Sequence, residues 1–264
     1  PVRTKQYVPG APPRNITAMA TSPTTISVSW LPPPVERANG RIIYYKVFFV
    51  EVGRADSEAT ITTLNKTHIV LDELKRWTEY KIWTLAGTSV GDGPRSHPII
   101  VRTHEDVPGD PQDVKATPLN STSIHVTWKP PLEKDRNGII RGYHIHVQEM
   151  RDEGKGFLNE PLKFDVVDSL EYNVTGLQPD TKYSIQVAAL TRKGDGDRSA
   201  AVIVKTPGGV PVRPTVSLKI MERDPIVSIE LEWERPAQTY GELRGYRLRW
   251  GVKDQPLKEE ILPG

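Results

Sequence analysis

The sequence lacks cysteine entirely across its 264 residues. This absence excludes disulfide-stabilised folds, zinc sites with thiolate ligands, iron–sulfur clusters and cysteine nucleophiles from the chain. Long hydrophobic runs are also lacking, since none approaches the roughly 20 residues that cross a bilayer. An excess of one charge is lacking too, because 35 Lys and Arg stand against 33 Asp and Glu. That balance argues against a nucleic-acid binder.

Proline and glycine, by contrast, are abundant, with 24 and 20 residues. They separate short runs rich in Val, Ile, Thr, Tyr and Trp, a pattern typical of all-β sandwiches and barrels. Three runs alternate apolar and polar residues and end in tryptophan: 26–30, 124–128 and 229–233. Alternation with period two buries one face of a strand. The closing tryptophans are therefore predicted core residues: Trp30, Trp128 and Trp233.

An internal repeat organises the chain. The segment 2–10 recurs at 101–109 and, more loosely, at 204–211. Each copy has a tyrosine at the start of its third predicted strand, and the first two copies have another before the sixth. These tyrosines are also predicted core residues: Tyr45, Tyr143, Tyr246, Tyr80 and Tyr183. Short strands with regularly spaced turns describe an immunoglobulin-like sandwich.

Together these motifs resemble fibronectin type III domains over essentially the whole chain. The resemblance rests on tryptophan followed by proline, on the third-strand tyrosine, and on the Leu-x-Pro-x-Thr-x-Tyr segment at 177–183. That segment also resembles a tyrosine corner, in which a buried tyrosine hydroxyl bonds to the upstream backbone. The first copy departs from the pattern, with Trp77 between Leu74 and Thr78 where Pro179 stands in the second.

The predicted fold is therefore all-β, with tandem fibronectin type III (immunoglobulin-like) sandwiches in an extended array. We expect residues 1–7 to end a preceding repeat or linker, 8–106 and 107–207 to form complete domains, and 208–264 to form the N-terminal half of a third. Half a sandwich cannot bury its inner face. We therefore expect 208–264 to be frayed and sensitive to proteases.

Longer segments narrow the resemblance to the membrane-side type III repeats of LAR-type (leukocyte common antigen-related) receptor protein tyrosine phosphatases. They are 74–80, 105–108, 118–122, 193–196 and 241–248. The resemblance implies a single-pass plasma-membrane receptor that acts in cell adhesion, axon guidance and synapse organisation, with phosphatase domains inside the cell. It also implies that the family's ligands, heparan sulfate proteoglycans and synaptic adhesion proteins, bind mainly elsewhere in the parent.

On this resemblance the chain is a non-enzymatic extracellular spacer and interaction segment, whose partners are extracellular proteins or neighbouring ectodomain repeats. Tyrosine phosphatases need a low-pKa cysteine nucleophile, so the hydrolase activity belongs to the parent and not to this chain. Three alternatives stay open. They are the ectodomain of another cell-adhesion receptor with tandem type III repeats and no phosphatase, an accessory array in a secreted enzyme, and a cytosolic muscle-type array.

No catalytic, cofactor or metal site is predicted. His144 and His146 lie two residues apart on one face of a predicted strand, a spacing that can hold zinc. We expect both to face outward as solvated side chains. His125 also faces outward, but from the opposite sheet, so no third ligand converges on the pair.

Four of the seven asparagines stand in Asn-x-Ser/Thr sequons: Asn15, Asn65, Asn120 and Asn173. This excess over chance predicts N-glycosylation and an extracellular location. Strand phase points Asn173 outward, where a glycan fits.

The last candidate is an aromatic patch in the first complete domain. Strand alternation turns Tyr44, Lys46 and Phe48 outward on one strand, and Lys81 and Trp83 outward on a neighbouring strand. An exposed aromatic surface edged by lysines favours an interface with a partner or a neighbouring domain. The competing interpretation is an aromatic–lysine stack that only shields its own sheet.

Overall fold

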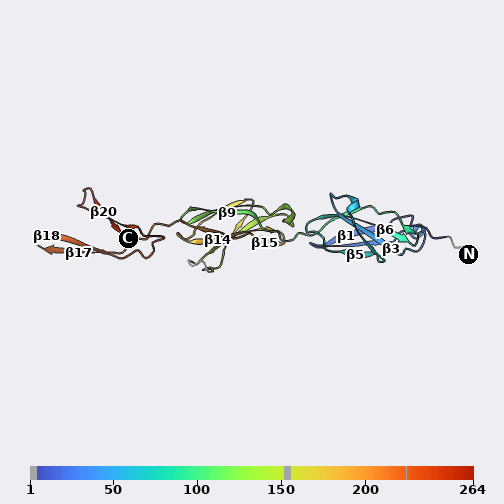
Figure 1. Cartoon of the computed structure of the whole chain (residues 1–264), viewed down its shortest axis with the longest axis horizontal. Coiled ribbons are helices and arrows are strands. Elements are labelled where there is room, and N and C mark those ends of the chain that lie inside the picture. The colour runs from blue at the N-terminus through green and yellow to red at the C-terminus, as the bar shows by residue number, and fades with distance from the viewer. Residues whose placement is uncertain (1–4, 152–155, 224) are drawn as a thin grey trace. The chain divides into compact units, whose positions relative to one another are not determined.

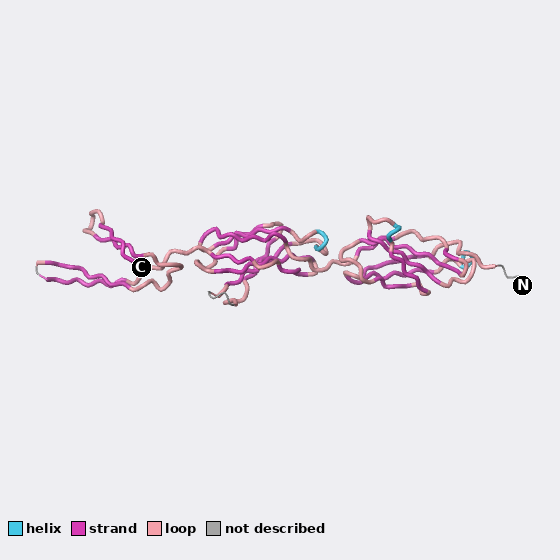
Figure 2. Tube along the Cα trace, in the orientation of Figure 1, coloured by secondary structure: helices cyan, strands magenta, loops and turns pink. Residues whose placement is uncertain are grey.

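The structure is a computed structural model that describes residues 5–151, 156–223 and 225–264. Within those ranges it contains strands, short 3-10 helices and no α-helix (Figures 1 and 2). The 3-10 helices are η1 (Val35–Arg37), η2 (Asp56–Glu58) and η3 (Glu133–Asp135). In this part of the chain no helix is both long and apolar enough to span a membrane.

Two antiparallel sheets form the first repeat. The first sheet has the order β1-β2-β5, with β1 (Arg14–Ser22), β2 (Thr25–Leu31) and β5 (His68–Leu71). The second has the order β4-β3-β6-β7, and β8 also pairs with β6. Its strands are β3 (Tyr44–Glu51), β4 (Thr60–Leu64), β6 (Glu79–Thr88), β7 (Gly91–Asp92) and β8 (Ile99–Arg102).

The second repeat has the same arrangement of strands. Its first sheet has the order β13-β10-β9, with β9 (Gln112–Asn120), β10 (Ser123–Lys129) and β13 (Glu171–Val174). Its second has the order β12-β11-β14-β15, and β16 also pairs with β14. Its strands are β11 (Gly142–Glu149), β12 (Leu162–Val166), β14 (Lys182–Thr191), β15 (Gly194–Arg198) and β16 (Val202–Lys205).

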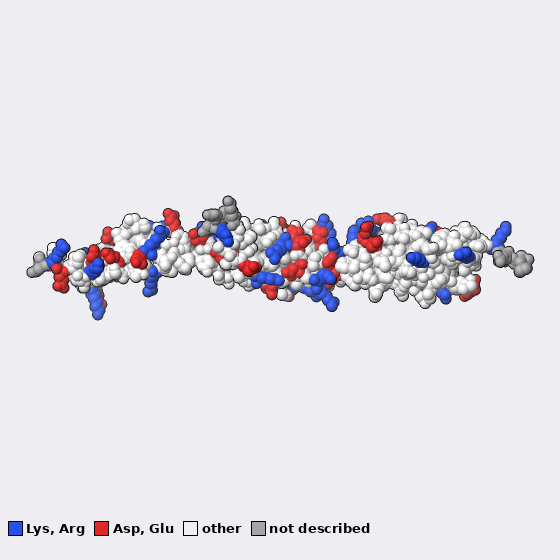
Figure 3. All heavy atoms as spheres, turned by 90° about the horizontal axis from the view of Figure 1, so that it is seen from below, with Lys and Arg blue, Asp and Glu red and all other residues white. Residues whose placement is uncertain are grey.

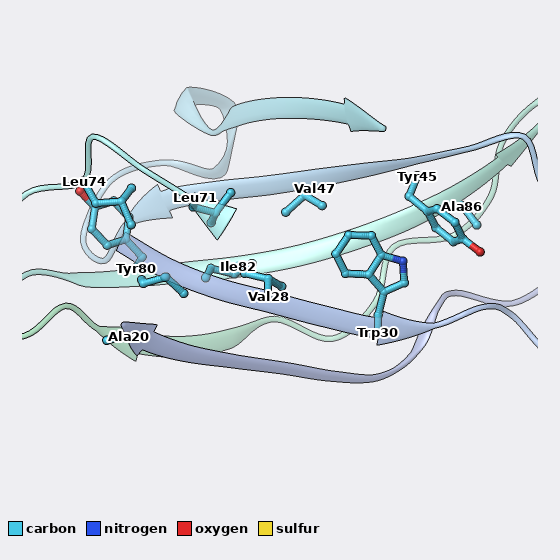
Figure 4. Packing of buried hydrophobic residues seen from close by; sticks show 11 residues of the cluster. Ala20, Val28, Trp30, Tyr45, Val47, Leu71, Leu74, Tyr80, Ile82 and Ala86 are labelled. Carbon is cyan, nitrogen blue, oxygen red and sulfur yellow. The ribbon is translucent and has the colours of Figure 1, made fainter. Parts of the chain in front are cut away.

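The core of the first repeat lies between its two sheets (Figure 4). Ile26, Val28 and Trp30 of β2 are at most 4% exposed, on one face as their alternation predicts. The rings of Trp30 and Tyr45 meet edge to face with centroids 5.6 Å apart. The remaining predicted core residues of the first two repeats are buried as well: Tyr80, Trp128, Tyr143 and Tyr183.

Both Leu-to-Tyr segments form tyrosine corners. The Tyr80 hydroxyl accepts a hydrogen bond from the Lys75 N–H at 2.9 Å, and the Tyr183 hydroxyl accepts one from the Gln178 N–H at 2.8 Å. In each repeat a threonine that follows the last strand also donates its hydroxyl to the carbonyl of that upstream residue, at 2.7 Å. In each corner, both the backbone N–H and the backbone carbonyl of the upstream residue, Lys75 or Gln178, therefore have a hydrogen-bond partner.

Replacing Tyr80 with phenylalanine is expected to lower the free energy of unfolding of the first repeat by about 1–3 kcal/mol, because the part-buried Lys75 N–H loses its acceptor. Denaturant titration followed by tryptophan fluorescence measures the change. Tyr183→Phe is the matched variant in the second repeat. Tyr7→Phe, at a side chain 66% exposed, is the neutral control. Losses no larger than that of the control in both corner variants would contradict the expectation.

The first corner places a tryptophan in an unusual backbone conformation. Trp77 corresponds to Asp180 of the second repeat, and not to Pro179 as the sequence comparison suggested. Both residues are left-handed, with φ of 48° and 52°, and both donate their N–H to a carbonyl, at 3.2 and 3.0 Å. This conformation costs a side-chain-bearing residue about 1–2 kcal/mol. The Arg102 guanidinium lies 4.8 Å from the Trp77 ring centroid and partly offsets that cost.

Residues beyond the second repeat form two hairpins: β17 (Val216–Arg223) with β18 (Ile226–Trp233), and β19 (Gly245–Trp250) with β20 (Lys258–Pro263). Trp233 and Tyr246, predicted as core residues, are only half-buried, with ring centroids 5.5 Å apart. The two hairpins are separate two-stranded sheets in the described part of the chain, and contact between these two rings leaves most of the apolar side chains of the first hairpin uncovered. Apolar side chains of the first hairpin accordingly stay more than half exposed: Val216, Leu218, Ile220, Ile226, Val227 and Ile229.

Candidate interaction surface

The outer face of the second sheet of the first repeat gathers all five residues of the predicted patch. In the register of β3 and β6, Phe48 lies opposite Trp83, and Lys81 lies opposite Val50. Two and four residues before Phe48, Lys46 and Tyr44 share its face, because side chains alternate along a strand. The register therefore brings together the residues that strand phase grouped.

The predicted exposure of the two large rings is wrong. Phe48 is 6% exposed and Trp83 is 3% exposed. Their rings stack with centroids 5.5 Å apart and planes 4° from parallel. With Val50 and Leu85 they form a hydrophobic cluster separate from the main core.

Cationic side chains cover this outer cluster, which explains its low exposure. The Arg95 guanidinium lies 5.1 Å from the Phe48 ring centroid and 6.0 Å from that of Trp83. Lys81 Nζ lies 5.4 Å from the Trp83 ring centroid. Lys and Arg can lay their aliphatic stems on apolar surface while the charged ends stay in water. These contacts match the competing interpretation, a stack that shields its own sheet.

Carboxylates hold two lysines of this face in place. Lys81 Nζ lies 2.7 Å from an Asp56 oxygen, and Lys46 Nζ lies 2.8 Å from an Asp92 oxygen. Lys46 Nζ also lies 5.6 Å from the Tyr44 ring centroid. Since all four charged side chains are 31–52% exposed, each pair adds no more than about 1 kcal/mol. The face therefore presents positioned charges to solvent and not open aromatic rings.

Asp92 also fixes Tyr44, whose hydroxyl donates a hydrogen bond to it at 2.5 Å. That hydrogen bond, then desolvation and the carboxylate charge, raise the pKa of Tyr44 to about 12. Burial acts to raise the pKa of Asp92, but hydrogen bonds from Lys46 and Tyr44 outweigh it and the pKa is lowered. Near neutral pH the Tyr44 hydroxyl thus stays protonated and Asp92 stays ionised.

Replacing Asp92 with asparagine is expected to bring the pKa of Tyr44 down from about 12 towards the ordinary tyrosine value. Because the pKa of Tyr44 is higher in the folded state than in the unfolded state, its hydrogen bond stabilises the fold fully below the unfolded-state pKa. This stabilisation is lost as the pH rises from roughly 10 to 12. Tyrosinate absorbance against pH measures the shift. Asp56→Asn, which removes only the Lys81 partner, is the control. Identical titration curves for Asp92→Asn and the unmodified chain would contradict the assignment.

The corresponding outer face of the second repeat carries polar side chains in place of the aromatic rings. His144 Nε2 lies 3.2 Å from an Asp165 oxygen, and the Gln186 side chain donates to a backbone carbonyl at 3.0 Å. His146 is 7% exposed and the His144 side chain is 16% exposed, so the expectation of solvated side chains is wrong for both. The reason is their place on β11, between β12 and β14, where His146 corresponds to the buried Phe48 of the first repeat.

His125 lies in the opposite sheet from His144 and His146, as predicted. Its Nδ1 is 2.7 Å from the Asn173 side-chain oxygen, and its Nε2 is 3.7 Å from a Glu171 oxygen. Across the residues that the structure describes, no group of three or more His, Asp or Glu side chains is placed to hold a metal ion.

All four sequon asparagines are exposed: Asn15, Asn65, Asn120 and Asn173. Asn120 is held by its own turn, where its side-chain oxygen accepts hydrogen bonds from the Thr122 N–H at 2.9 Å and the Ser123 hydroxyl at 2.5 Å. Asn173 points outward from β13, as strand phase predicts. Exposure is what a glycan acceptor requires, and glycosylation itself stays a prediction.

The sequence analysis did not predict a hydrogen bond that joins the leading segment of each complete repeat to a loop of the same repeat. Asn39 Nδ2 donates to the Val8 carbonyl at 3.0 Å, and Asn137 Nδ2 donates to the Val107 carbonyl at 2.9 Å. Both asparagines are left-handed, with φ of 53°, a conformation that Asn tolerates. A signal existed, because in both copies an Asn-Gly pair follows the Val-Pro-Gly segment, with the asparagine 31 and 30 residues after the valine.

Charged side chains of both signs are interspersed on the face of the molecule shown in Figure 3. This agrees with the balanced composition, in which the net charge is +2. A large area of one sign, of the kind that steers polyanions, is not seen on that face.

Comparison with known proteins gives a consistent result. The fibronectin type III domain family matches residues 11–102 and 109–205. Tyrosine-protein phosphatase Lar of Drosophila melanogaster is 90% identical over 264 residues, 100% of this chain and 13% of that protein. Receptor-type tyrosine-protein phosphatase F of Mus musculus is 42% identical over 266 residues, 98% of this chain and 14% of that protein.

A solved structure also shares sequence with the chain. The crystal structure of the FN5 domain of Drosophila Lar is 82% identical and covers 39% of this chain and 100% of that domain, with a TM-score of 0.34. The chain spans only 13–14% of the length of the two curated relatives.

Proposed function

This chain belongs to the fibronectin type III domain family, and we propose that it is an extracellular, non-enzymatic segment of a receptor-type tyrosine phosphatase. The observation that carries the proposal is the similarity of the chain, over its full length, to such a phosphatase. The sequence has no cysteine to act as a phosphatase nucleophile. Dephosphorylation is therefore assigned to other parts of the receptor.

The role we assign to the segment is spacing. Hydrogen bonds from Asn39 and Asn137 hold the leading segment of each repeat against a loop of that repeat. Proline in the same segments limits their backbone freedom further. A segment built in this way keeps the ligand-binding end of a receptor away from the membrane, in support of cell adhesion, axon guidance and synapse organisation.

The spacing role is tested by replacing residues 8–207 in the full-length receptor. One replacement is an unrelated pair of type III domains, and the other is a Gly/Ser chain of the same residue number. We expect the domain pair to sustain ligand-dependent adhesion of receptor-expressing cells and the Gly/Ser chain to weaken it. Failure of both replacements would show that a specific surface of this segment is needed, and full activity of both would overturn the spacing role.

The extracellular location has its own test. Chain secreted from eukaryotic cells should lose mass on treatment with an N-glycosidase, because its sequon asparagines are exposed. Asn→Gln variants at the four sites, made singly, assign the occupied positions. Secreted protein with no glycan at any site would favour an intracellular type III array.

A further inference from the structure

Strand β4 is an edge strand with none of the usual protection against strand pairing. It ends the β4-β3-β6-β7 sheet and pairs only with β3 among the described strands. Its five residues, Thr60-Ile61-Thr62-Thr63-Leu64, carry no charge and no proline. Edge strands in monomeric proteins are normally blunted by charged residues, prolines or bulges.

Among the described strands, the longer ones that end a sheet show that protection. β12, at the same position in the second repeat, carries Lys163 and Asp165 and follows Pro161. Among described sheet-ending strands of at least five residues, β4 alone has no charged side chain. Ile61 is moreover 55% exposed, and Thr60 and Thr63 are exposed. The free edge therefore combines unpaired backbone groups with β-branched side chains, which favour strands.

We propose that β4 pairs with β4 of a second copy of this chain, antiparallel about Thr62, so that two sheets join edge to edge. Such a two-fold pairing is self-complementary. It sets Ile61 of each copy opposite Thr63 of the other, on the outer face. It sets Thr60 opposite Leu64 on the inner face.

Charge at the ends of β4 fits this register. Glu58 precedes the strand by two residues and Lys66 follows it by two. Glu58 is the last residue of η2, where its carboxylate also accepts a hydrogen bond from the Ala55 N–H. The two-fold pairing brings this end of one copy to the Lys66 end of the other, twice in the dimer. A parallel pairing in register would instead set like charges together, which is unfavourable.

The row of side chains behind the edge supports the pairing. In the β3–β4 register Ile61 lies beside Phe48, which in turn lies opposite Trp83. Because the stacked rings are covered and rigidly packed, β4 rests on an ordered sheet, and pairing costs little further ordering. The joined surface is small, so the dimer is weak and concentration-dependent.

The test is sedimentation velocity of the chain from roughly 10 µM to 1 mM, where small interfaces begin to associate. The chain is produced without glycans, because the sequon asparagine Asn65 directly follows β4. We expect the average mass to rise towards that of a dimer with concentration. Ile61→Lys should raise the dissociation constant at least tenfold. Ile100→Lys, at a residue 61% exposed on β8 of the same sheet, is the matched control and should leave it unchanged.

Reversing the charges at the two ends of β4 tests the proposed register without changing β4 itself. Glu58→Lys and Lys66→Glu should each weaken the dimer, and the double variant should restore it. Thermal unfolding of each variant checks that these exposed substitutions leave the fold intact. A monomer over the whole concentration range, a dimer disrupted by Ile100→Lys and not by Ile61→Lys, or a double variant that stays monomeric would each overturn the proposal.

Discussion

Replacing Trp83 with alanine should lower the free energy of unfolding of the first repeat by about 3–5 kcal/mol, the usual cost of removing a buried aromatic side chain. Trp83 is 3% exposed and stacks on Phe48. The substitution leaves a cavity on the outer face and takes the ring from beneath Arg95 and Lys81. For a domain of roughly 100 residues the melting temperature should fall by about 12–40 °C.

The matched control is Ile100→Ala, on the same face of the neighbouring strand β8, where the side chain is 61% exposed. It should change the stability by no more than about 0.5 kcal/mol. Thermal and denaturant unfolding of both variants decide between the two interpretations of the patch. If Trp83→Ala cost as little as the control, the indole would be a surface residue available to partners, as the strand pattern alone suggested.

The face of the sheet on which each side chain lies could be predicted from the sequence, because it depends only on the alternation of side chains along a strand. Alternation assigned Tyr45 and Val47 to one face of β3 and Phe48 to the other, and the register of the sheet agrees. The tyrosine corners were equally predictable, since each is built from a short segment whose residues meet within a few positions. Tyr80 and Tyr183 both make the expected bond.

The covering of the outer face could not be predicted in the same way. Arg95 and Asp92 come from a later part of the chain, and Asp56 from the turn before β4. Period-two patterning says which way a side chain points, but not whether a long cationic side chain from another segment will lie over it. The burial of Phe48 was missed for this reason, and the burial of His146 was missed because the pattern does not show that β11 lies between β12 and β14.

The two complete repeats therefore share a core and differ on one outer face. Trp30 and Trp128 occupy equivalent core sites. On the outer face the first repeat has stacked rings under cations, whereas the second has histidines and Gln186. Because the fold constrains the inner face most strongly, the outer face is where repeats of one array can acquire different properties.

The hairpin of β17 and β18 should exchange its backbone amide hydrogens at least a thousandfold faster than β2 and β6. Every residue of its ladder is paired, from Val216 with Trp233 to Arg223 with Ile226. Yet β17 buries no side chain, and Ile220 is 63% exposed. An isolated hairpin is marginal in water, so its opening free energy should lie near zero, whereas core strands open only at a cost close to the global stability.

Hydrogen exchange followed by mass spectrometry on peptides from 216–223, 226–233 and 25–31 measures the difference directly. β10, the second-repeat equivalent of β18, is the internal control, because its Ile124 and Val126 are fully buried between two sheets. β10 is paired with β9 on one side and with β13 on the other, whereas β18 is paired with β17 alone. The comparison is therefore made between the amides of β18 that face β17 and the amides of β10 that face β9, so that hydrogen bonding is matched and burial differs. Slow, uniform protection across the hairpin would mean that its backbone ladder alone holds it closed, contrary to the argument that a covered apolar face is what stabilises these strands.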